Sequence, residues 1–471
     1  MNTFSLAWRN LLRNRRRSIT TLLAMIVGAN AVLLFGGYSR NITYGLQTDY
    51  VKYGGHLQIQ REGYYRFGSG NPAAYGLAQY REIIAAIQQD PVLKPLVLVA
   101  TPTLQLQGIA GNFGAGVSRT ALGLGVVVED QNRMRAWNGY DFPVQVPQMA
   151  LTGTGPETAV LGTGLARVLQ LCGPLKLQDC KAAANPVNPA NSVNPAKAEA
   201  DLPADIAGLG QLANGPEAAP PTSAAAIEML AATAQGAPNV ARLQVVKAEE
   251  QGVKEFDDVY VGLHLAQAQQ LVFGKEAPKA TAIVLQLQRT EQIPAAKARL
   301  EQLLAERFPQ EPVEVLDFSA LNPFYGQALA MFATLFGFVA LLIAAIVLFT
   351  VGNTMSMAVI ERTVEIGTLR AMGLRRARLR RLFMQEGLLL GVVGAVLGVS
   401  IAASLAGLIN HSGLTWTPPG RSPVPLIIRV WGETGLIAGT TVGLILVAAL
   451  SAWLPSLRAA RQNIVDALRH V

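Results

Sequence analysis

The residues that could support chemistry in this chain are few and widely spaced. The sequence contains two cysteines and four histidines, which are Cys172, Cys180, His56, His264, His411 and His470. It has no G-x-x-x-x-G-K-[ST] sequence that could bind the phosphates of ATP, and no G-x-S-x-G, H-E-x-x-H or C-x-x-C motif. Scattered histidines are more typical of surface or packing positions than of metal ligands. We therefore expect no catalytic residue, no metal site and no cofactor bound by this chain.

One stretch, Glu361–Arg381, has the residue types and spacing to bind another protein. It lacks proline and is predicted to be helical. Glu361 and Glu365 lie one helical turn apart, so both can accept charge-assisted hydrogen bonds from a basic partner. Its seven arginines are Arg362, Arg370, Arg375, Arg376, Arg378, Arg380 and Arg381. Composition alone is equally consistent with a solvated basic turn between two membrane helices.

Three further positions give this predicted helix a possible docking role. Arg370 can pair with an acidic side chain of a partner. Gly367 has no side chain, so on a docking face it would allow close approach. Gly373 can end the helix with a positive φ angle.

Long apolar runs position this stretch. Hydrophobic residues make up 51% of the 471 residues and charged residues only 15%, which is typical of a membrane protein with a soluble domain. About 20 apolar residues cross a bilayer, and arginines at the ends of such runs indicate the cytoplasmic side. The net charge of +8 would be compatible with nucleic-acid binding. The arginines concentrate beside the apolar runs, however, which favours anionic lipid as their partner and argues against nucleic acid.

The resulting prediction is an α-helical membrane protein with four transmembrane helices and a large α+β extracytoplasmic domain between the first and the second. We expect both termini in the cytoplasm and the protein in the inner (cytoplasmic) membrane. The predicted segments are an amphipathic N-terminal helix at 1–17, transmembrane helices at 18–38, 328–351, 387–410 and 432–454, the external domain at 39–327, a cytoplasmic coupling segment at 352–386, an external loop at 411–431 and a cytoplasmic tail at 455–471.

The large domain is predicted to mix strands and helices. Alternating patterns predict strands at His56–Gln60, Leu104–Gln107, Arg242–Val246 and Ala282–Gln288. Helical patterns appear at Ala78–Gln89, Gly164–Leu171, Leu263–Phe273 and Pro294–Arg307. The residues up to about Tyr53 are expected to extend the first membrane helix outward as a stalk. Residues 181–240 are rich in Ala, Asn and Pro and are predicted to be a low-complexity insertion, with one possible helix at Ser223–Ala234.

Two other groups of residues have structural roles in this prediction. Cys172 and Cys180 both fall on the external side and could form a disulfide, although two free thiols are the alternative. Gly394 and Gly398 in the third span, and Gly435, Gly439 and Gly443 in the fourth, have the small-xxx-small spacing that allows membrane helices to approach closely. Packing within the chain is the simplest role for both sets.

The connector resembles the cytoplasmic signature of the FtsX-like ABC transporter permeases, a family that includes MacB, LolC and LolE. The matching residues are Glu361, Arg362, Glu365, Ile366, Gly367, Arg370, Ala371 and Gly373. In that family the segment is the coupling helix, which docks in a groove of the ATPase subunit. The sequences LGTGLARVLQL at Leu161–Leu171 and FDDVYVGLHLAQAQQLV at Phe256–Val272 resemble, more loosely, the MacB-like periplasmic core domain.

The resemblance implies a permease subunit that works with a separate cytosolic ABC ATPase, which binds the ATP and Mg²⁺. It also implies a second permease subunit, identical or paralogous, and allows a periplasmic or outer-membrane partner. An amphiphile such as a lipoprotein or lipid is the expected substrate. The alternatives are a mechanotransmission subunit that activates a periplasmic cell-wall hydrolase, or a drug or peptide efflux permease working with an outer-membrane channel.

Overall fold

The computed structural model describes residues 3–13, 15–142, 147–177, 225–252, 254–417 and 424–462. The chain divides into two units. One unit, here called the helical unit, combines Met1–Gln47 with Asn322–Val471, and the other, the sheet unit, comprises Thr48–Leu321. Each unit is described by itself.

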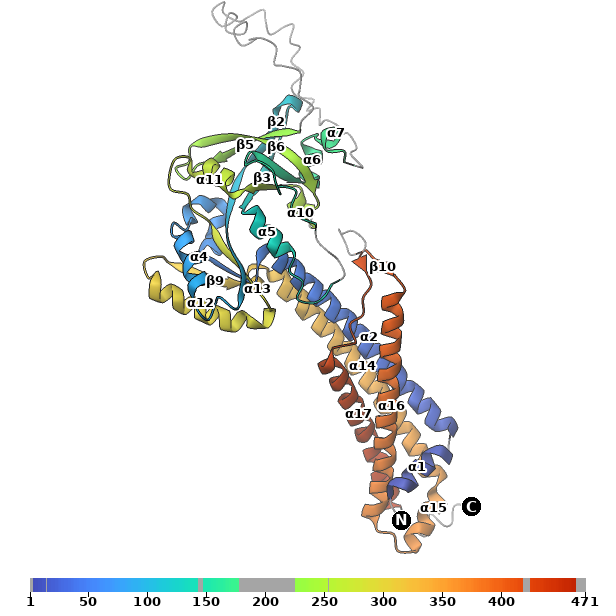
Figure 1. Cartoon of the computed structure of the whole chain (residues 1–471). Helices are drawn as coiled ribbons and strands as arrows, with labels where there is room; N and C mark the ends of the chain where they lie inside the picture. Colours follow the sequence, from blue (N-terminus) through green and yellow to red (C-terminus); the bar gives the residue numbers. More distant parts are fainter. Residues whose placement is uncertain are drawn as a thin grey trace, which may run out of the picture. The chain divides into compact units, whose positions relative to one another are not determined.

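Among the described residues of the helical unit, four helices are long and apolar enough to cross a membrane (Figure 1). They are α2 (Arg15–Gly54), α14 (Pro323–Glu361), α16 (Arg376–His411) and α17 (Thr434–Arg461). Two shorter helices complete the unit, α1 (Thr3–Arg13) and α15 (Thr363–Ala371), and a two-stranded sheet pairs β10 (Thr415–Trp416) with β11 (Val424–Pro425). The long helices extend past the apolar runs, and α17 continues through Pro455 to Arg461. The helix α2 continues past the predicted span to Gly54; its outward direction stays a prediction.

In the part of the sheet unit that the structure describes, nine strands form one sheet in the order β3-β7-β4-β6-β5-β2-β8-β1-β9. Their bounds are β1 Leu57–Arg61, β2 Val97–Asn112, β3 Val117–Val126, β4 Thr158–Gly162, β5 Ala226–Ala232, β6 Pro238–Glu249, β7 Tyr260–His264, β8 Ala282–Leu287 and β9 Val313–Asp317. The helices are α3 Tyr64–Phe67, α4 Tyr80–Gln89, α5 Val128–Arg135, α6 Thr163–Val168, α7 Cys172–Leu175, α10 Lys254–Asp257, α11 Leu265–Phe273, α12 Ile293–Arg307 and α13 Phe318–Leu321, with 3-10 turns η1 Gly68–Gly70, η2 Pro72–Tyr75, η3 Phe113–Ala115 and η5 Thr290–Gln292.

One part of the sheet unit has a ferredoxin-like arrangement. The strands β2, β8, β1 and β9 are neighbours and all pair antiparallel. The helix α4 connects β1 to β2, and α12 connects β8 to β9, which gives the β-α-β-β-α-β order of that fold. Both helices bury apolar faces against the strands in one core, as Ile83 and Ile87 of α4 and Leu300 and Leu303 of α12 show.

The second part of the sheet unit is a closed ring of strands. Because β3 pairs with β2 as well as with β7, the strands β2, β3, β7, β4, β6 and β5 close on themselves. The long strand β2 is shared by both parts, since its first half pairs with β8 and its second half with β5. A separate core fills the ring, and α6 and α11 pack on it through residues such as Leu165 and Leu271.

The predicted insertion at 181–240 is partly wrong. Residues 178–224 lie outside the described structure, but the last part of the predicted segment contributes to the sheet. The possible helix at Ser223–Ala234 is instead the strand β5, which pairs with β6 from Ala226 to Ala232. Ile227, Met229 and Ala231 alternate inward along it. This period of two determines the structure despite the helix-favouring alanines, because alternate side chains of β5 fill the core of the ring.

Candidate functional site

The connector between α14 and α16 contains a nine-residue helix, α15, as the sequence predicted. The helix ends in a Schellman turn. The N–H of Gly373 donates to the carbonyl of Arg370 at 3.0 Å, and the N–H of Leu374 donates to the carbonyl of Leu369 at 3.1 Å. Gly373 has φ 92°, the left-handed conformation that this turn requires and that glycine adopts most easily.

The predicted docking face of α15 is wrong in one respect. Ile366 and Gly367 are both buried, so Gly367 faces its own chain. Three apolar side chains are exposed in or just after α15: Val364, Leu369 and Met372, at 45%, 36% and 72%. Val364 and Met372 lie two helical turns apart and therefore share one side of the helix.

The two glutamates that we expected to meet a partner already form ion pairs within the chain. Glu365 accepts from Arg13 at 2.7 Å, and Glu361 accepts from Arg17 at 2.8 Å. Arg370 donates to the backbone carbonyl of Gln462. Exposed pairs of this kind are weak, so they do not prevent a partner from binding nearby.

Glu386 is a residue of this region that the sequence did not single out. It lies in α16, is 2% exposed and pairs with Arg362 at 3.1 Å. The side-chain amide of Asn10 also donates to it at 2.6 Å. A lone glutamate at the start of an apolar run was the available signal. Its partners are 24 and 376 positions away, so no local pattern links them.

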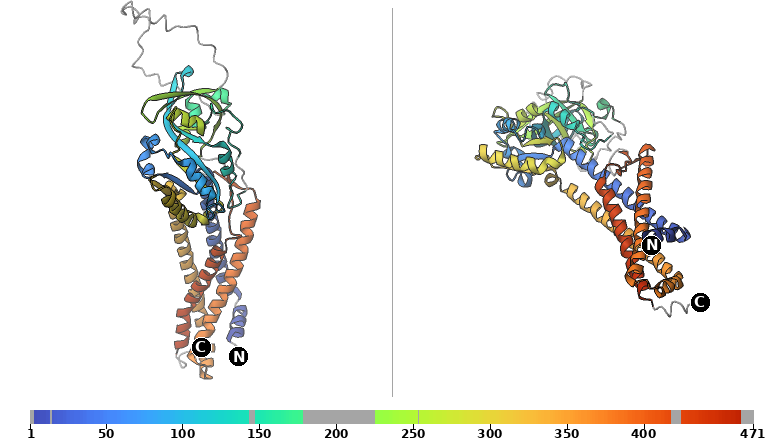
Figure 2. Two further views of the ribbon diagram at one scale, coloured as in Figure 1. Left: turned by 60° about the vertical axis from the view of Figure 1, so that its left-hand side comes forward. Right: turned by 60° about the horizontal axis from the view of Figure 1, so that its bottom comes forward.

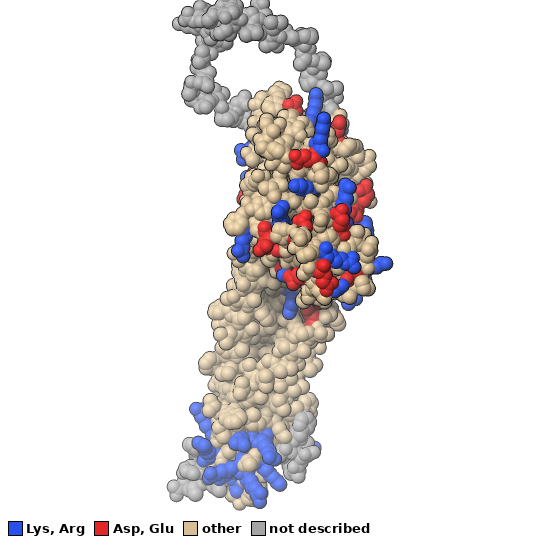
Figure 3. Space-filling view, turned by 90° about the vertical axis from the view of Figure 1, so that its left-hand side faces the viewer, with Lys and Arg blue, Asp and Glu red and all other residues tan. Residues whose placement is uncertain are grey.

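Arginines gather at the end of the helical unit that carries α1 and α15. Figure 3 shows Lys and Arg side chains concentrated at that end, next to an uncharged belt over the long helices. Five exposed arginines, Arg375, Arg376, Arg378, Arg380 and Arg381, surround the start of α16. A helix N-terminus is itself positive, so this cluster favours an anionic surface.

The predicted glycine pair of α16 is at a close helix contact. A Cβ atom on Gly394 would lie 2.8 Å from the sulfur of Met25, and one on Gly398 would lie 2.4 Å from the Cβ of Ala29. Two further glycines of α16, Gly387 and Gly391, pack this helix against α17. A Cβ on Gly387 would meet that of Ala452 at 2.4 Å. The side-by-side course of α16 and α17 is visible in Figure 2.

The expectation that the glycines of α17 pack within the chain is wrong. A Cβ atom built on Gly435, Gly439 or Gly443 meets no atom of the described chain within 4 Å. The helices α2, α14 and α16 pack against other sides of α17, through positions such as Leu444 and Ala448. This glycine face is therefore open to lipid or to another subunit.

The cysteines and histidines have structural surroundings. Cys172 is disulfide-bonded, but Cys180 lies outside the described residues, so their pairing stays a prediction. Burial lowers the pKa of His56 to about 3. Burial also lowers the pKa of His264, with Glu129 opposing that shift. Within the described ranges, no group of three or more His, Cys, Asp or Glu side chains is placed to hold a metal ion.

The end of α2 is fixed within the sheet unit. A Cβ on Gly55 would lie 2.7 Å from the carbonyl oxygen of Leu285, so the backbones are in close contact. The amide of Gln286 donates to the carbonyl of Val51 at 3.1 Å. The guanidinium of Arg135 lies 5.4 Å from the centre of the Tyr53 ring.

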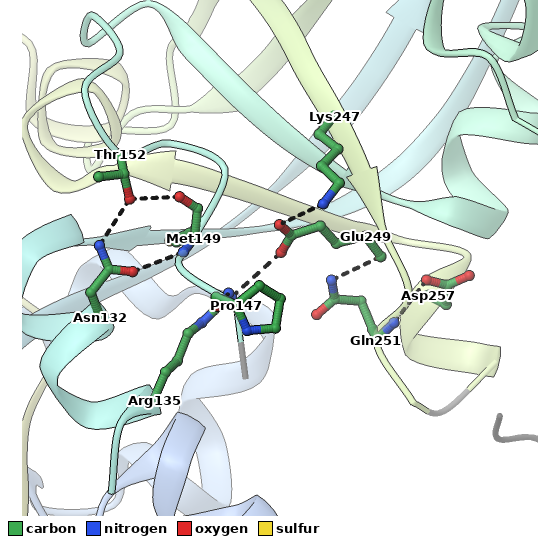
Figure 4. A network of polar contacts seen from close by, with 9 residues as sticks. All are labelled: Asn132, Arg135, Pro147, Met149, Thr152, Lys247, Glu249, Gln251 and Asp257. Atoms are coloured by element: carbon green, nitrogen blue, oxygen red, sulfur yellow. Dashed lines mark hydrogen bonds and ion pairs between the residues drawn. The ribbon is translucent and has the colours of Figure 1, made fainter. Parts of the chain in front are cut away.

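Arg135 itself belongs to a polar network at the end of the ring of strands (Figure 4). It donates to Glu249 at 3.5 Å and to the carbonyl of Pro147 at 3.4 Å. Asn132, one turn earlier in α5, accepts from the N–H of Met149 at 2.8 Å. The network thus connects α5, the segment before β4 and the end of β6.

Comparisons with known proteins support a permease. The family model described as FtsX-like permease C-terminal matches residues 335–464. An uncharacterized ABC transporter permease of Methanocaldococcus jannaschii is 26% identical over 235 residues, which cover 48% of this chain and 55% of that protein. The lipoprotein-releasing system transmembrane protein LolC of Neisseria meningitidis is 27% identical over 246 residues, covering 50% and 56%.

The macrolide export ATP-binding/permease protein MacB of Hyphomonas neptunium is 28% identical over 161 residues, which cover 34% of this chain and 24% of that protein. The chain therefore spans less than two thirds of the length of each of these relatives. The matched region 335–464 contains the connector, most of α14 and all of α16. The family model and these relatives support the assignment of this chain to the FtsX/MacB-type ABC transporter permeases.

Proposed function

We propose that this chain is the permease subunit of an ABC transporter in which a separate cytosolic ATPase drives motion of the sheet unit outside the membrane. The observation that carries this proposal is α15. It is a short helix between two membrane-length helices, and it exposes Val364, Leu369 and Met372 at the arginine-rich end of the unit. Apolar side chains left exposed beside each other on one short segment support a contact with another protein.

The same features support a topology. Arginines at one end of the apolar helices favour the cytoplasmic side for α1, α15 and both termini. Because α2 and α14 each cross the membrane in this proposal, the residues between them form the external domain. The external loop then contains β10 and β11.

The substrate proposed is an amphiphile that is released or exported from the membrane. The name of LolC, lipoprotein-releasing, and that of MacB, macrolide export, both describe transport. A second permease subunit is part of the proposal. The open face formed by Gly435, Gly439 and Gly443 on α17 suits close packing with another membrane helix.

Replacement of the exposed apolar residues tests the ATPase-docking role. We expect Val364→Asp combined with Met372→Asp to leave the chain folded and inserted, because both side chains are exposed. The ABC ATPase that co-purifies with the tagged wild-type chain should be lost. Ala377→Asp is a control for an added carboxylate, since Ala377 is exposed at the start of α16, five residues beyond Met372. Retention of the ATPase by the double variant would contradict the proposal.

A further inference from the structure

A buried polar junction joins three segments of the helical unit. Glu386 of α16 receives hydrogen bonds on one carboxylate oxygen from the amide of Asn10 in α1 at 2.6 Å and from Arg362 at 3.1 Å. Arg362 lies between α14 and α15, and it also donates to the backbone carbonyl of Asn10 at 3.4 Å. The side chains of Arg362 and Glu386 are 11% and 3% exposed.

Two outer ion pairs extend this junction. Arg13, the last residue of α1, pairs with Glu365 of α15 at 2.7 Å. Arg17, in the first turn of α2, pairs with Glu361 at 2.8 Å. Both pairs bring the N-terminal part of the chain onto residues more than 340 positions later.

Apolar contacts hold α1 at the same place. Ala7 is buried with Leu382 and Leu389 of α16, and Leu11 packs against this group. A helix that only rested on the lipid surface would leave the buried carboxylate of Glu386 without the amide of Asn10. Buried charges are costly unless they are paired and hydrogen-bonded, so α1 is a structural part of this junction.

We propose that Asn10, Arg13 and Arg17 are positioning residues that fasten α1 and the start of α2 to α15, so that a displacement of α15 is carried into α2. This inference rests on the proposed function, in which the ATPase moves α15. It adds the N-terminal helix to the coupling apparatus. These contacts add the N-terminal residues to the elements that hold α15, beside the burial of Ile366 and the bond from Arg370 to Gln462.

The other end of α2 is fixed too, which a transmitting helix requires. Val51 accepts a hydrogen bond from the buried amide of Gln286, and the N–H of His56 donates to the carbonyl of Leu285 at 2.8 Å. The helix α2 is continuous from Arg15 to Gly54, so its first turn and the residues that contact β8 belong to one helix.

The experiment uses the full chain in nanodiscs, with and without its co-purified ATPase. The test variant is Arg13→Glu with Arg17→Glu, and the rescue variant adds Glu365→Arg and Glu361→Arg. The control is Arg9→Glu with Arg16→Glu, which makes the same charge change at exposed positions that form no ion pair among the described residues. Hydrogen exchange of the α1 amides reports the junction without the ATPase. ATP turnover, ATPase co-purification and ATP-dependent changes in exchange at β8 report coupling.

We expect the test variant to lose about tenfold in α1 protection, because two exposed ion pairs are lost and replaced by repulsion. It should keep the ATPase bound and lose the ATP-dependent change at β8, and the rescue variant should restore both α1 protection and that change. Unchanged α1 protection, or a normal response at β8 despite a loosened α1, would overturn the inference. Failure of the wild-type chain to bind any ATPase would instead refute the proposed function, and the exchange result for α1 would still stand.

Discussion

The contact between α16 and α2 at Gly398 allows a prediction with a matched internal control. A Cβ atom on Gly398 would lie 2.4 Å from the Cβ of Ala29, whereas carbon atoms pack best at about 3.5–4.0 Å. Gly398→Ala therefore forces the two helices apart by about 1 Å. Overpacking of this size costs about 1–3 kcal/mol. The higher helix propensity of alanine stabilises the helix by about 0.5–1 kcal/mol. The free energy of unfolding should therefore fall by about 1–2 kcal/mol in total.

Gly439→Ala is the control, because a Cβ at Gly439 meets no atom of the described chain within 4 Å. The same chemical change should there be neutral or slightly stabilising. Thermal unfolding of the purified chain in detergent measures both variants, and about 2–4 °C are expected per kcal/mol. A midpoint for Gly398→Ala equal to or above that of the wild type would refute the packing argument. If Gly439→Ala lowers the stability of a two-subunit complex but not that of the single chain, the α17 face that carries Gly439 is the subunit interface.

Two further predictions concern the sheet unit. The ring nitrogen Nδ1 of His56 accepts from the N–H of Leu287 at 2.9 Å, so the folded unit requires neutral His56, consistent with its pKa of about 3. The unfolded chain binds the proton near pH 6.5, so stability should be complete above pH 6.5 and fall as the pH drops towards 3, by about 2 kcal/mol at pH 5. Thermal unfolding at pH 8 and pH 5 measures this loss, and His56→Gln should show a smaller dependence; an equal dependence would exclude His56 as its source. We also expect a disulfide between Cys172 and Cys180, which mass spectrometry of non-reduced digests would detect, and alkylation of both thiols would rule it out.

Features with a local signal were predicted well. The four apolar helices, α15 and the turn at Gly373 follow from hydropathy, helix propensity and the conformational freedom of glycine. The strands β1 and β8 were also found by their local alternation and composition. The strand β5 was missed because its alanines favour a helix, and only the core of the closed ring makes its alternate side chains buried.

Features that depend on distant contacts were not predictable from one sequence. Gly367 and Gly439 look alike as small residues on helices, yet the first is buried and the second is open within the described chain. Hydropathy does not reveal which side of a helix its neighbours cover. From the sequence alone, Glu386 would be assigned to the membrane surface. In the structure it is buried and paired with Asn10 and Arg362, which are distant or separate in sequence.

The middle of α2 determines how far a displacement could travel along it. Gly36 and Gly37 are adjacent, and glycine pairs are common places for a helix to bend. At this point α2 is contacted by Arg429, which lies in the segment before α17. The N–H of Arg429 donates to the carbonyl of Gly37 at 3.2 Å, and its side chain donates to Asn41 at 3.2 Å and lies over the ring of Tyr44. Because these contacts span two turns beyond the glycine pair, they resist bending of α2 at this point within the helical unit.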